Sequence, residues 1–547
     1  MKKDFPRVGR PEKRFSKGWN FVAAGLLALA GCRSLDDQVE RQVGRTAGPV
    51  GPLAAQARSE VERARQAETN TVAHLELDLD TALRTAAQYS RELQGAREAL
   101  YLDTLSLFGT RRDFGLTFEG SVAYILNQRP DGDTARASGQ LVVQRILPTG
   151  GRIGLAGQVE QNRREPEGGE TTTGYQSGGR VRLDQPLLAG AGYEASHAPL
   201  IQAERDYVYA LRDFVVQRQD LALRVMREYY GLLQARRVLE NTRLNVQQVV
   251  FLRQRSEALF RVSRAPAIDV LRSQQEELSA VNRLQAGEES FAIQVSRLLV
   301  FLGLPATGTA SIGDTVPEVK PLDLAEADSI ALGLARRLDL LNTTDRIADA
   351  ERNLRLARQA RRPELSVYGE ASLDAPEAES LGDQEYASSQ SAGVELELPL
   401  DRRDERDAAR RAAIALAAAR RNGQEKLDSV RLEIASSFSD LRSLRTTVDL
   451  EARNIEVAGK RARNASLRFR NGELSNRDVL EAENDLLNAR NAWAQARIDY
   501  ELQRMQLMRN LGLLDVAEDG TLVELPSPAG AVAPDAPAAL PNFEVME

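Results

Sequence analysis

Apolar residues recur every three or four positions over long stretches in the second half of the chain. The first such seam consists of Leu427, Val430, Ile434, Phe438, Leu441, Leu444 and Val448, and the second of Ala482, Leu486, Ala489, Trp493, Ala496 and Tyr500. This period is typical of amphipathic helices that bury one narrow face. A further stretch, about 194–260, would extend ~100 Å as a single helix. No globular core requires that length, so the pattern indicates a tunnel or a fibre.

Shorter segments between the predicted helices have a period of two. Their apolar positions are Phe114, Leu116, Phe118, Val122, Tyr124, Val181, Leu183, Val394, Leu396 and Leu398. The polar positions that alternate with them include Arg180, Arg182, Asp184, Glu395 and Glu397. Strands with one apolar and one polar face give this alternation, in a half-buried soluble sheet as well as in a membrane barrel. The alternation therefore predicts strands and leaves their surroundings open.

Pro148-Thr149-Gly150-Gly151 separates two of these apolar segments and predicts a tight hairpin turn. Polar stretches at 127–137 and 162–177 predict longer loops on the other side. Short turns on one side and long loops on the other are typical of outer-membrane barrels. The sequence leaves open whether this extra hairpin, near 139–160, joins the other strands.

The chain contains an internal duplication of about 200 residues. Phe260-Arg261, Asp269-Val270-Leu271 and Leu302-Gly303 recur as Phe469-Arg470, Asp478-Val479-Leu480 and Leu511-Gly512, each 209 residues later. In each copy a helix comes first, at about 79–109 and 325–361. Alternating segments follow, and then a very long helical stretch that is broken by one turn. We therefore expect repeats at 77–304 and 322–515, a linker at 305–321, and a disordered Pro- and Ala-rich tail at 516–547.

The start of the chain has the layout of a secretory signal peptide: a basic stretch, a short apolar run and then small residues. The apolar run is about half as long as a bilayer-spanning helix. Leu29-Ala30-Gly31-Cys32 resembles the bacterial lipobox, and Cys32 is the only cysteine of the chain. We therefore expect a signal peptide at 1–31, a lipid on Cys32, and an anchor segment and linker at 32–76.

Composition argues against several classes of function. The formal net charge is −7, so no electrostatic argument favours nucleic-acid binding. The two histidines, His74 and His197, are too far apart for a metal-ligand motif, and no phosphate-binding glycine loop or Cys–His pair is present. We expect neither an enzyme nor a cofactor or metal site. Beyond the leader no run of eighteen apolar residues occurs, so a membrane-spanning part is expected to be a closed barrel.

Several motifs occur in a fixed order in the two copies. They are Arg362-Pro363-Glu364-Leu365 leading into a strand, strands that end in Gln185-Pro186-Leu187-Leu188 or Leu398-Pro399-Leu400, and the turns Phe260 to Leu271 and Phe469 to Leu480. In this order they resemble the TolC-type outer-membrane efflux protein family over about residues 77–515.

This resemblance implies a mainly α fold with membrane β-strands. Three protomers would form one β-barrel in the outer membrane and an α-helical tunnel across the periplasm. Because four strands cannot close a barrel, and three protomers supply at least twelve, a homotrimer agrees with the strand count. The resemblance further implies a passive conduit of a tripartite efflux or type I secretion system. Its partners would be a periplasmic adaptor, an inner-membrane pump and outer-membrane lipid.

The resemblance also implies roles for particular residues. Arg261, Asp269, Arg470, Gly472 and Asp478 are candidates for contact with the adaptor at the periplasmic tips. Alternatively, Asp269 and Asp478 are N-caps or first-turn acids of the returning helices, and both roles can hold together. The first copy departs from the family pattern, with Ser263 at a position where glycine is frequent and with Ala265-Pro266 inserted.

On the strands, Arg180, Arg182, Asp184, Glu395 and Glu397 would face the lumen if the apolar face meets lipid. On an ordinary soluble sheet the same side chains would face solvent. The competing function is a periplasmic coiled-coil structural or adaptor lipoprotein without a pore. A cytoplasmic scaffold would require the lipobox to be accidental.

Overall fold

The computed structural model describes residues 75–129, 132–166, 169–263, 266–313, 315–321, 324–398, 400–471 and 473–524. They all belong to one compact unit, His74–Glu547. Cys32 and Gly472, the expected signal peptide and nearly all of the expected anchor segment lie outside the described residues. Within the described residues, no helix combines the length and apolarity that crossing a membrane requires.

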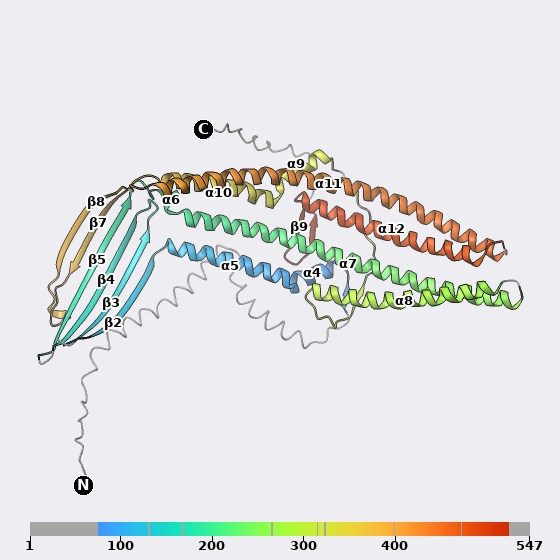
Figure 1. Cartoon of the computed structure of the whole chain (residues 1–547), viewed down its shortest axis with the longest axis horizontal. Coiled ribbons are helices and arrows are strands. Elements are labelled where there is room, and N and C mark those ends of the chain that lie inside the picture. Colours follow the sequence, from blue (N-terminus) through green and yellow to red (C-terminus); the bar gives the residue numbers. More distant parts are fainter. Residues whose placement is uncertain are drawn as a thin grey trace, which may run out of the picture. The chain divides into compact units, whose positions relative to one another are not determined.

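Two copies of one arrangement make up this unit (Figure 1). The first consists of α4 (Leu79–Tyr89), α5 (Arg91–Asp113), β2 (Thr117–Arg129), β3 (Gly132–Ile146), β4 (Arg152–Pro166), β5 (Thr172–Pro186), α6 (Tyr193–Ser196), α7 (Ala198–Arg261) and α8 (Ala267–Phe301). The second consists of α9 (Glu326–Arg336), α10 (Leu338–Gln359), β7 (Glu364–Asp374), η1 (Leu381–Asp383), β8 (Ala387–Glu397), α11 (Arg403–Arg470) and α12 (Asn476–Asn510). The elements thus follow the order that the duplication predicts.

The helix that opens each copy is broken once, whereas the sequence predicts it as continuous. Ser90 separates α4 from α5, and Arg337 separates α9 from α10. Both residues have extended backbone angles, with ψ of 124° and 121°. Both are buried, and Arg337 has its guanidinium between Asp339 and Glu433. Tertiary contacts of the linking residue therefore override helical propensity at the same place in each copy.

One antiparallel sheet of six strands has the order β2-β3-β4-β5-β7-β8. The extra hairpin, β3 and β4, lies inside this sheet between β2 and β5. Its turn is tight as expected, with the Gly150 N–H 2.9 Å from the Leu147 carbonyl oxygen. Gly150 has a φ of +91°, and a Cβ there would lie 2.7 Å from the Gly190 carbonyl oxygen, so only glycine fits.

The expected polar loops at 127–137 and 162–177 are mostly strand instead. β2 continues to Arg129 and β3 begins at Gly132, with thirteen residues of β2 paired to β3. β4 continues to Pro166, and β5 begins at Thr172. Polar composition suggested loops, but ladder hydrogen bonds satisfy the backbone of polar strands equally well.

The main hydrophobic core lies between the long helices of both copies, around Met226, Leu233, Leu298, Tyr500 and Leu507. The predicted seams are confirmed: Val430, Ile434, Ala482, Ala489 and Ala496 are all buried. Two small strand pairs border the core, β1 (Leu75–Leu77) with β6 (Ala310–Ile312), and β9 (Leu514–Val516) with β10 (Leu522–Glu524).

Residues 516–524, which were expected to belong to the disordered tail, are part of the fold. Residues 522–524 form β10, and Arg504 of α12 holds this strand through Glu524, with a shortest nitrogen–oxygen distance of 2.7 Å. Arg504 also binds Glu501 at 2.9 Å and is almost completely buried. This ion-pair network and the turn at Gly520, whose φ is +89°, keep the hairpin in place.

Candidate functional site

Neither face of the six-stranded sheet is covered by a described helix (Figure 1). The sheet extends beyond the ends of α5, α7, α10 and α11, and its strands are 11 to 15 residues long. About 9–11 residues suffice for a tilted strand to cross the hydrocarbon of a bilayer. The chemistry of the two faces therefore decides what surrounds this sheet.

Strand pairing places the apolar positions on one common face. Phe118 pairs with Val143, Val143 with Leu155, and Leu155 with Val181. Directly paired residues share a face, and Val394 pairs with Val367 on the same face farther along the sheet. These side chains are unusually exposed for their type, for example Val122 at 83% and Val394 at 69%. An uncovered apolar surface of this kind marks contact with lipid or another protein.

The five residues predicted to face the lumen all lie on the opposite face. Arg180, Arg182 and Asp184 alternate on β5 and pair with Ser372, Glu370 and Tyr368 of β7. Glu395 and Glu397 of β8 pair with Ser366 and Glu364 of β7. These two residues lie on the same face of β7 as the partners of Arg180, Arg182 and Asp184. The sheet thus brings together, on one polar face, charges from both copies of the duplication.

An ion-pair chain crosses this polar face. The Arg182 side chain lies 2.8 Å from Asp184 and 3.6 Å from Glu370, and Arg180 lies 3.4 Å from the same Glu370. The Arg182 guanidinium also lies over the Tyr368 ring, 5.4 Å from its centroid. Because both arginine side chains are about half exposed, these pairs contribute little to stability. They give the face a mixed, hydrophilic surface.

At the far ends of the helices lie two turns. Between α7 and α8, Ser263 has a φ of +59°, in the left-handed region that glycine enters without strain. This is the position where the sequence departs from the family pattern. Arg261 ends α7, and Asp269 lies in the first turn of α8, 3.9 Å from Arg272.

Ser475 is the N-cap residue of α12, and Asp478 lies in the first turn of this helix. The two form a capping box, in which the Asp478 carboxylate accepts from the Ser475 N–H at 2.9 Å and the Ser475 side chain accepts from the backbone N–H of Asp478. The Ser475 hydroxyl also lies 2.6 Å from the Asp478 carboxylate. These hydrogen bonds hold the pKa of Asp478 below its usual value. Asp478 and Asp269 are thus both first-turn acids of the returning helices, as the alternative reading expects. Pro266 is the N-cap residue of α8, and among the described residues Asp269 forms no capping box of this kind.

A hollow of about 640 Å³ lies on α11 and α12 behind this turn. Arg470 and Leu467 line it near the tip, and Gly459 and Ala462 line it farther along α11. Small residues on one helix leave room for another helix to approach closely. Several large apolar side chains near the two tips are exposed, namely Phe260, Val262, Ile268, Leu271 and Leu467.

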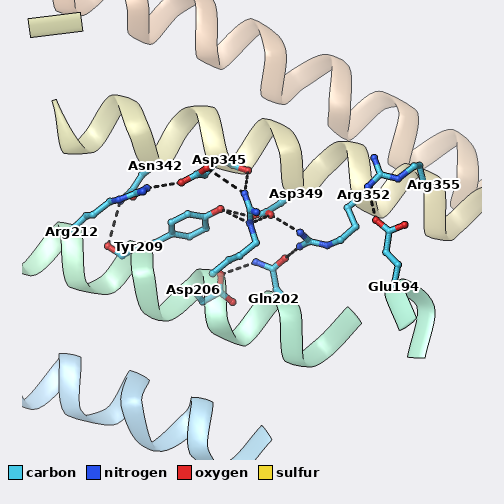
Figure 2. A network of polar contacts seen from close by, with 11 residues as sticks. Glu194, Gln202, Asp206, Tyr209, Arg212, Asn342, Asp345, Asp349, Arg352 and Arg355 are labelled. Carbon is cyan, nitrogen blue, oxygen red and sulfur yellow. Dashed lines mark hydrogen bonds and ion pairs between the residues drawn. The ribbon is translucent and has the colours of Figure 1, made fainter. Parts of the chain in front are cut away.

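A polar network that the sequence does not single out joins the two copies near the sheet (Figure 2). The Tyr209 hydroxyl of α7 donates to Asp349 of α10 at 2.5 Å, and Arg352 lies 2.9 Å from the same carboxylate. Arg205 also binds Asp349, and Arg212 lies 2.6 Å from Asp345. Burial and the hydrogen bond to Asp349 raise the pKa of Tyr209 to about 12. The network fastens α10 to α7 and offers no exposed reactive group.

Among the described residues, no three His, Cys, Asp or Glu side chains lie close enough together to hold a metal ion. The arrangement therefore consists of surfaces: a two-faced sheet, two helical tips and the helices between them.

Comparison with known proteins agrees with this architecture. The family model described as "Outer membrane efflux protein" matches residues 330–513. None of the curated proteins matches the chain by sequence.

Several solved structures share the fold. The CmeC outer membrane channel of Campylobacter jejuni is 15% identical, with a TM-score of 0.60 over 79% of this chain and 85% of that one. The outer membrane protein VceC of Vibrio cholerae is 16% identical, with a TM-score of 0.60 over 79% and 96%. The open state of the MtrE outer membrane channel of Neisseria gonorrhoeae is 14% identical, with a TM-score of 0.57 over 79% and 88%. At these identities the likeness concerns the fold. Residues 330–513, most of the second copy, match the outer membrane efflux protein family, and the whole duplicated unit shares the fold of outer-membrane channels.

Proposed function

We propose that this protein is the outer-membrane channel of a tripartite efflux or type I secretion system. It is a passive conduit for export across the periplasm and the outer membrane. The observation that carries the proposal is the uncovered sheet, apolar on one face and charged on the other, at the end of helices of 64 and 68 residues. Helices of that length extend ~100 Å, which suits a periplasmic tunnel.

β2 and β8 are the two edges of the sheet, since no other strand of the described residues pairs with their outer sides. In a homotrimer, β8 of each protomer would pair with β2 of the next, and the apolar faces would meet lipid while the charged faces line the lumen. Since β3 and β4 lie inside the sheet, three protomers would supply eighteen strands. Barrel diameter grows roughly linearly with strand number, so this pore would be about 1.5 times as wide as one of twelve strands.

The helical tips would meet the hairpin of a periplasmic adaptor, which connects the conduit to an inner-membrane pump. Three features support this role: the exposed apolar side chains at the tips, the exposed Arg261 and the hollow beside Arg470. Asp478 would contribute by fixing the geometry of its turn, and Asp269 and Gly472 remain candidates for direct contact.

The amino-terminal end would be attached to the membrane by a lipid on Cys32. One acyl anchor binds reversibly, whereas a barrel makes the attachment permanent. Replacing Cys32 with alanine is expected to abolish palmitate labelling of the mature protein and to leave the trimer in the outer membrane. Labelling that persists in this variant would contradict the lipobox assignment.

The channel and the competing coiled-coil lipoprotein are separated by the behaviour of purified outer membranes. A channel is expected to migrate as a trimer in detergent before heating and as a monomer after it, to resist alkaline washing, and to conduct ions in a planar bilayer. A peripheral coiled-coil protein would be released by the alkaline wash and would not conduct. Release together with absence of conductance would end the channel proposal.

A further inference from the structure

An arginine-rich hollow lies where the second copy enters and leaves the sheet. Its volume is about 690 Å³, and it is lined by Arg358, Arg361, Arg362, Leu400, Asp401, Arg402, Arg403 and Arg406. Six arginines thus face a single aspartate. The last turn of α10, with Arg358, and the first turn of α11 both line the hollow, together with the connections into β7 and out of β8.

Most of these arginines are not neutralised by the protein. Asp401 pairs with Arg403 at 3.2 Å. Arg358, Arg361, Arg362 and Arg406 form no ion pair with a carboxylate of the described residues, although Glu364, Asp404 and Glu405 are their neighbours in the sequence. The amino terminus of the 68-residue helix α11 adds its partial positive charge at the same place. The positive charge of the hollow therefore favours the binding of an anion from outside the chain.

An apolar side chain shares the hollow. Leu400 is 99% exposed, the most exposed large apolar side chain among the described residues, although it lies among guanidinium groups. Leu396 and Val394 of β8 are exposed on the apolar face of the sheet, and Leu398, just beyond the end of β8, is exposed as well. A ligand that contacts both surfaces must be anionic at one end and apolar along its length.

In the first copy, the residues at the junction between the helices and the sheet are of a kind found at membrane interfaces. At its matching connections into β2 and out of β5 lie Phe114 and Tyr193, whose rings pack on either side of His197 with centroid distances of 4.8 and 4.4 Å. Tyr193 is half exposed. Amphipathic aromatic side chains collect at the headgroup level of bilayers.

We propose that the arginine-rich hollow binds the phosphate of an anionic phospholipid, with Leu400 and the apolar face of β8 against its acyl chain. Arginine forks suit phosphate oxygens, and clusters of basic residues beside a membrane attract anionic headgroups. The inference rests on the proposed function, since it requires the sheet to span the outer membrane. It adds a lipid site at the periplasmic end of each protomer's sheet.

A neighbouring protomer is a less suitable occupant. If β8 pairs with β2 of the next protomer, the connection it meets there contains Arg111 and Arg112, which add positive charge. The same connection contains one carboxylate, Asp113, so two positive charges face one negative charge there, and Glu204 of α7 is already bound to Arg111 at 3.0 Å. An anion from the surrounding lipid therefore complements the hollow better than a second copy of this chain.

The test uses the purified full-length protein and a triple variant, Arg358→Gln, Arg361→Gln and Arg362→Gln. These three arginines form no ion pair that the substitutions would break. The matched control, Arg421→Gln, Arg445→Gln and Arg453→Gln, removes three exposed charges farther along α11 that likewise form no ion pair with a described carboxylate. Dissociation constants are measured by native mass spectrometry for short-chain phosphatidylglycerol, short-chain phosphatidylcholine and inorganic phosphate.

The unaltered protein and the control are expected to prefer phosphatidylglycerol to phosphatidylcholine, and the triple variant is expected to bind phosphatidylglycerol about 10- to 100-fold more weakly. Equal binding by the triple variant and the control would overturn the lipid site. Inorganic phosphate that binds as tightly as phosphatidylglycerol would overturn the lipid as the source of the anion. Preference for phosphatidylglycerol in a protein that forms no conducting trimer would keep the site and end the proposed function, so the two failures are distinguishable.

Discussion

Replacing Val143 with arginine is expected to reduce the amount of assembled trimer in the outer membrane more than tenfold. Val143 lies on the apolar face of the sheet between Phe118 and Leu155. An arginine on the lipid-facing side of a membrane strand costs about 2–4 kcal/mol at mid-depth and less near the interfaces. In a homotrimer that cost is incurred three times in one assembly.

The adjacent residue provides a matched control. Val142 lies on the polar face, paired with Glu119 and Ala156. Val142→Arg is expected to leave assembly nearly unchanged, because the new charge meets water and a glutamate. Trimer abundance is compared by unheated electrophoresis of outer membranes at equal expression. On a soluble, solvated sheet both substitutions would have similar small effects, so equal trimer levels would contradict the assignment of the two faces.

The period-two pattern was sufficient to predict the two faces of each strand, but not which strands pair in the sheet. Alternation fixes which residues of one strand share a side, and Arg180, Arg182 and Asp184 do share one. It carries no information about which strands pair. The position of β3 and β4 between β2 and β5 depends on ladders formed between strands, so the strand number per protomer followed only from the structure.

The helical seams were predictable for a related reason. Val430 and Ile434 are completely buried, and both repeat at the helical period over many turns. Over a seam of that length, single residues that depart from the helical period have little effect on the prediction. The predicted lengths of the long helices were also close to the observed ones. One difference is that His197 separates the short α6 from α7 within the stretch that was expected to be one helix.

The buried charged residues of α10 were not singled out from the sequence. Asp349 and Arg352 are both buried, but on an arginine-rich helix they have the pattern of a solvated face. Their partners Tyr209 and Gln202 lie 140 and 150 residues earlier in the chain. Helical spacing places such residues on one side of α10. Only the packing of α10 against α7 turns that side into a buried network (Figure 2).

The largest effect on stability is expected from replacing Arg337 with alanine. The Arg337 guanidinium is 5% exposed and binds Asp339, with a shortest nitrogen–oxygen distance of 2.6 Å, as well as Glu433. Removing Arg337 leaves Glu433 without this partner and Asp339 with Lys426 alone. Because the two carboxylates are 41% and 30% exposed, the expected cost is about 1.5–3 kcal/mol, less than for a fully buried pair. Because Glu433 belongs to α11, the substitution would loosen both the bend between α9 and α10 and its attachment to the long helix.

At low pH, the difference in the free energy of unfolding between the protein and the Arg337→Ala variant is expected to become smaller. Burial alone would raise the pKa of Asp339, but hydrogen bonds from Arg337 and from Lys426, which lies 2.8 Å away, outweigh it and hold the pKa well below its usual range. The pKa of Glu433 is lowered in the same way by Arg337. A carboxylate whose pKa is depressed by folding contributes stability above its unfolded pKa, near 4, and loses that contribution as the pH falls further.

The free energy of unfolding is therefore compared by denaturant titration of the purified protein and the Arg337→Ala variant at pH 7 and at pH 3. The difference is expected to be largest at pH 7 and smaller at pH 3, because protonated carboxyl groups leave less buried charge to compensate. Arg431→Ala, which removes an exposed arginine of α11 paired with Asp428 at 3.1 Å, is expected to change stability by no more than about 0.5 kcal/mol. If Arg337→Ala were as mild as this control, the buried pair would not hold the bend. If its effect were the same at both pH values, the lost stability would come from packing of the arginine side chain and not from its charge.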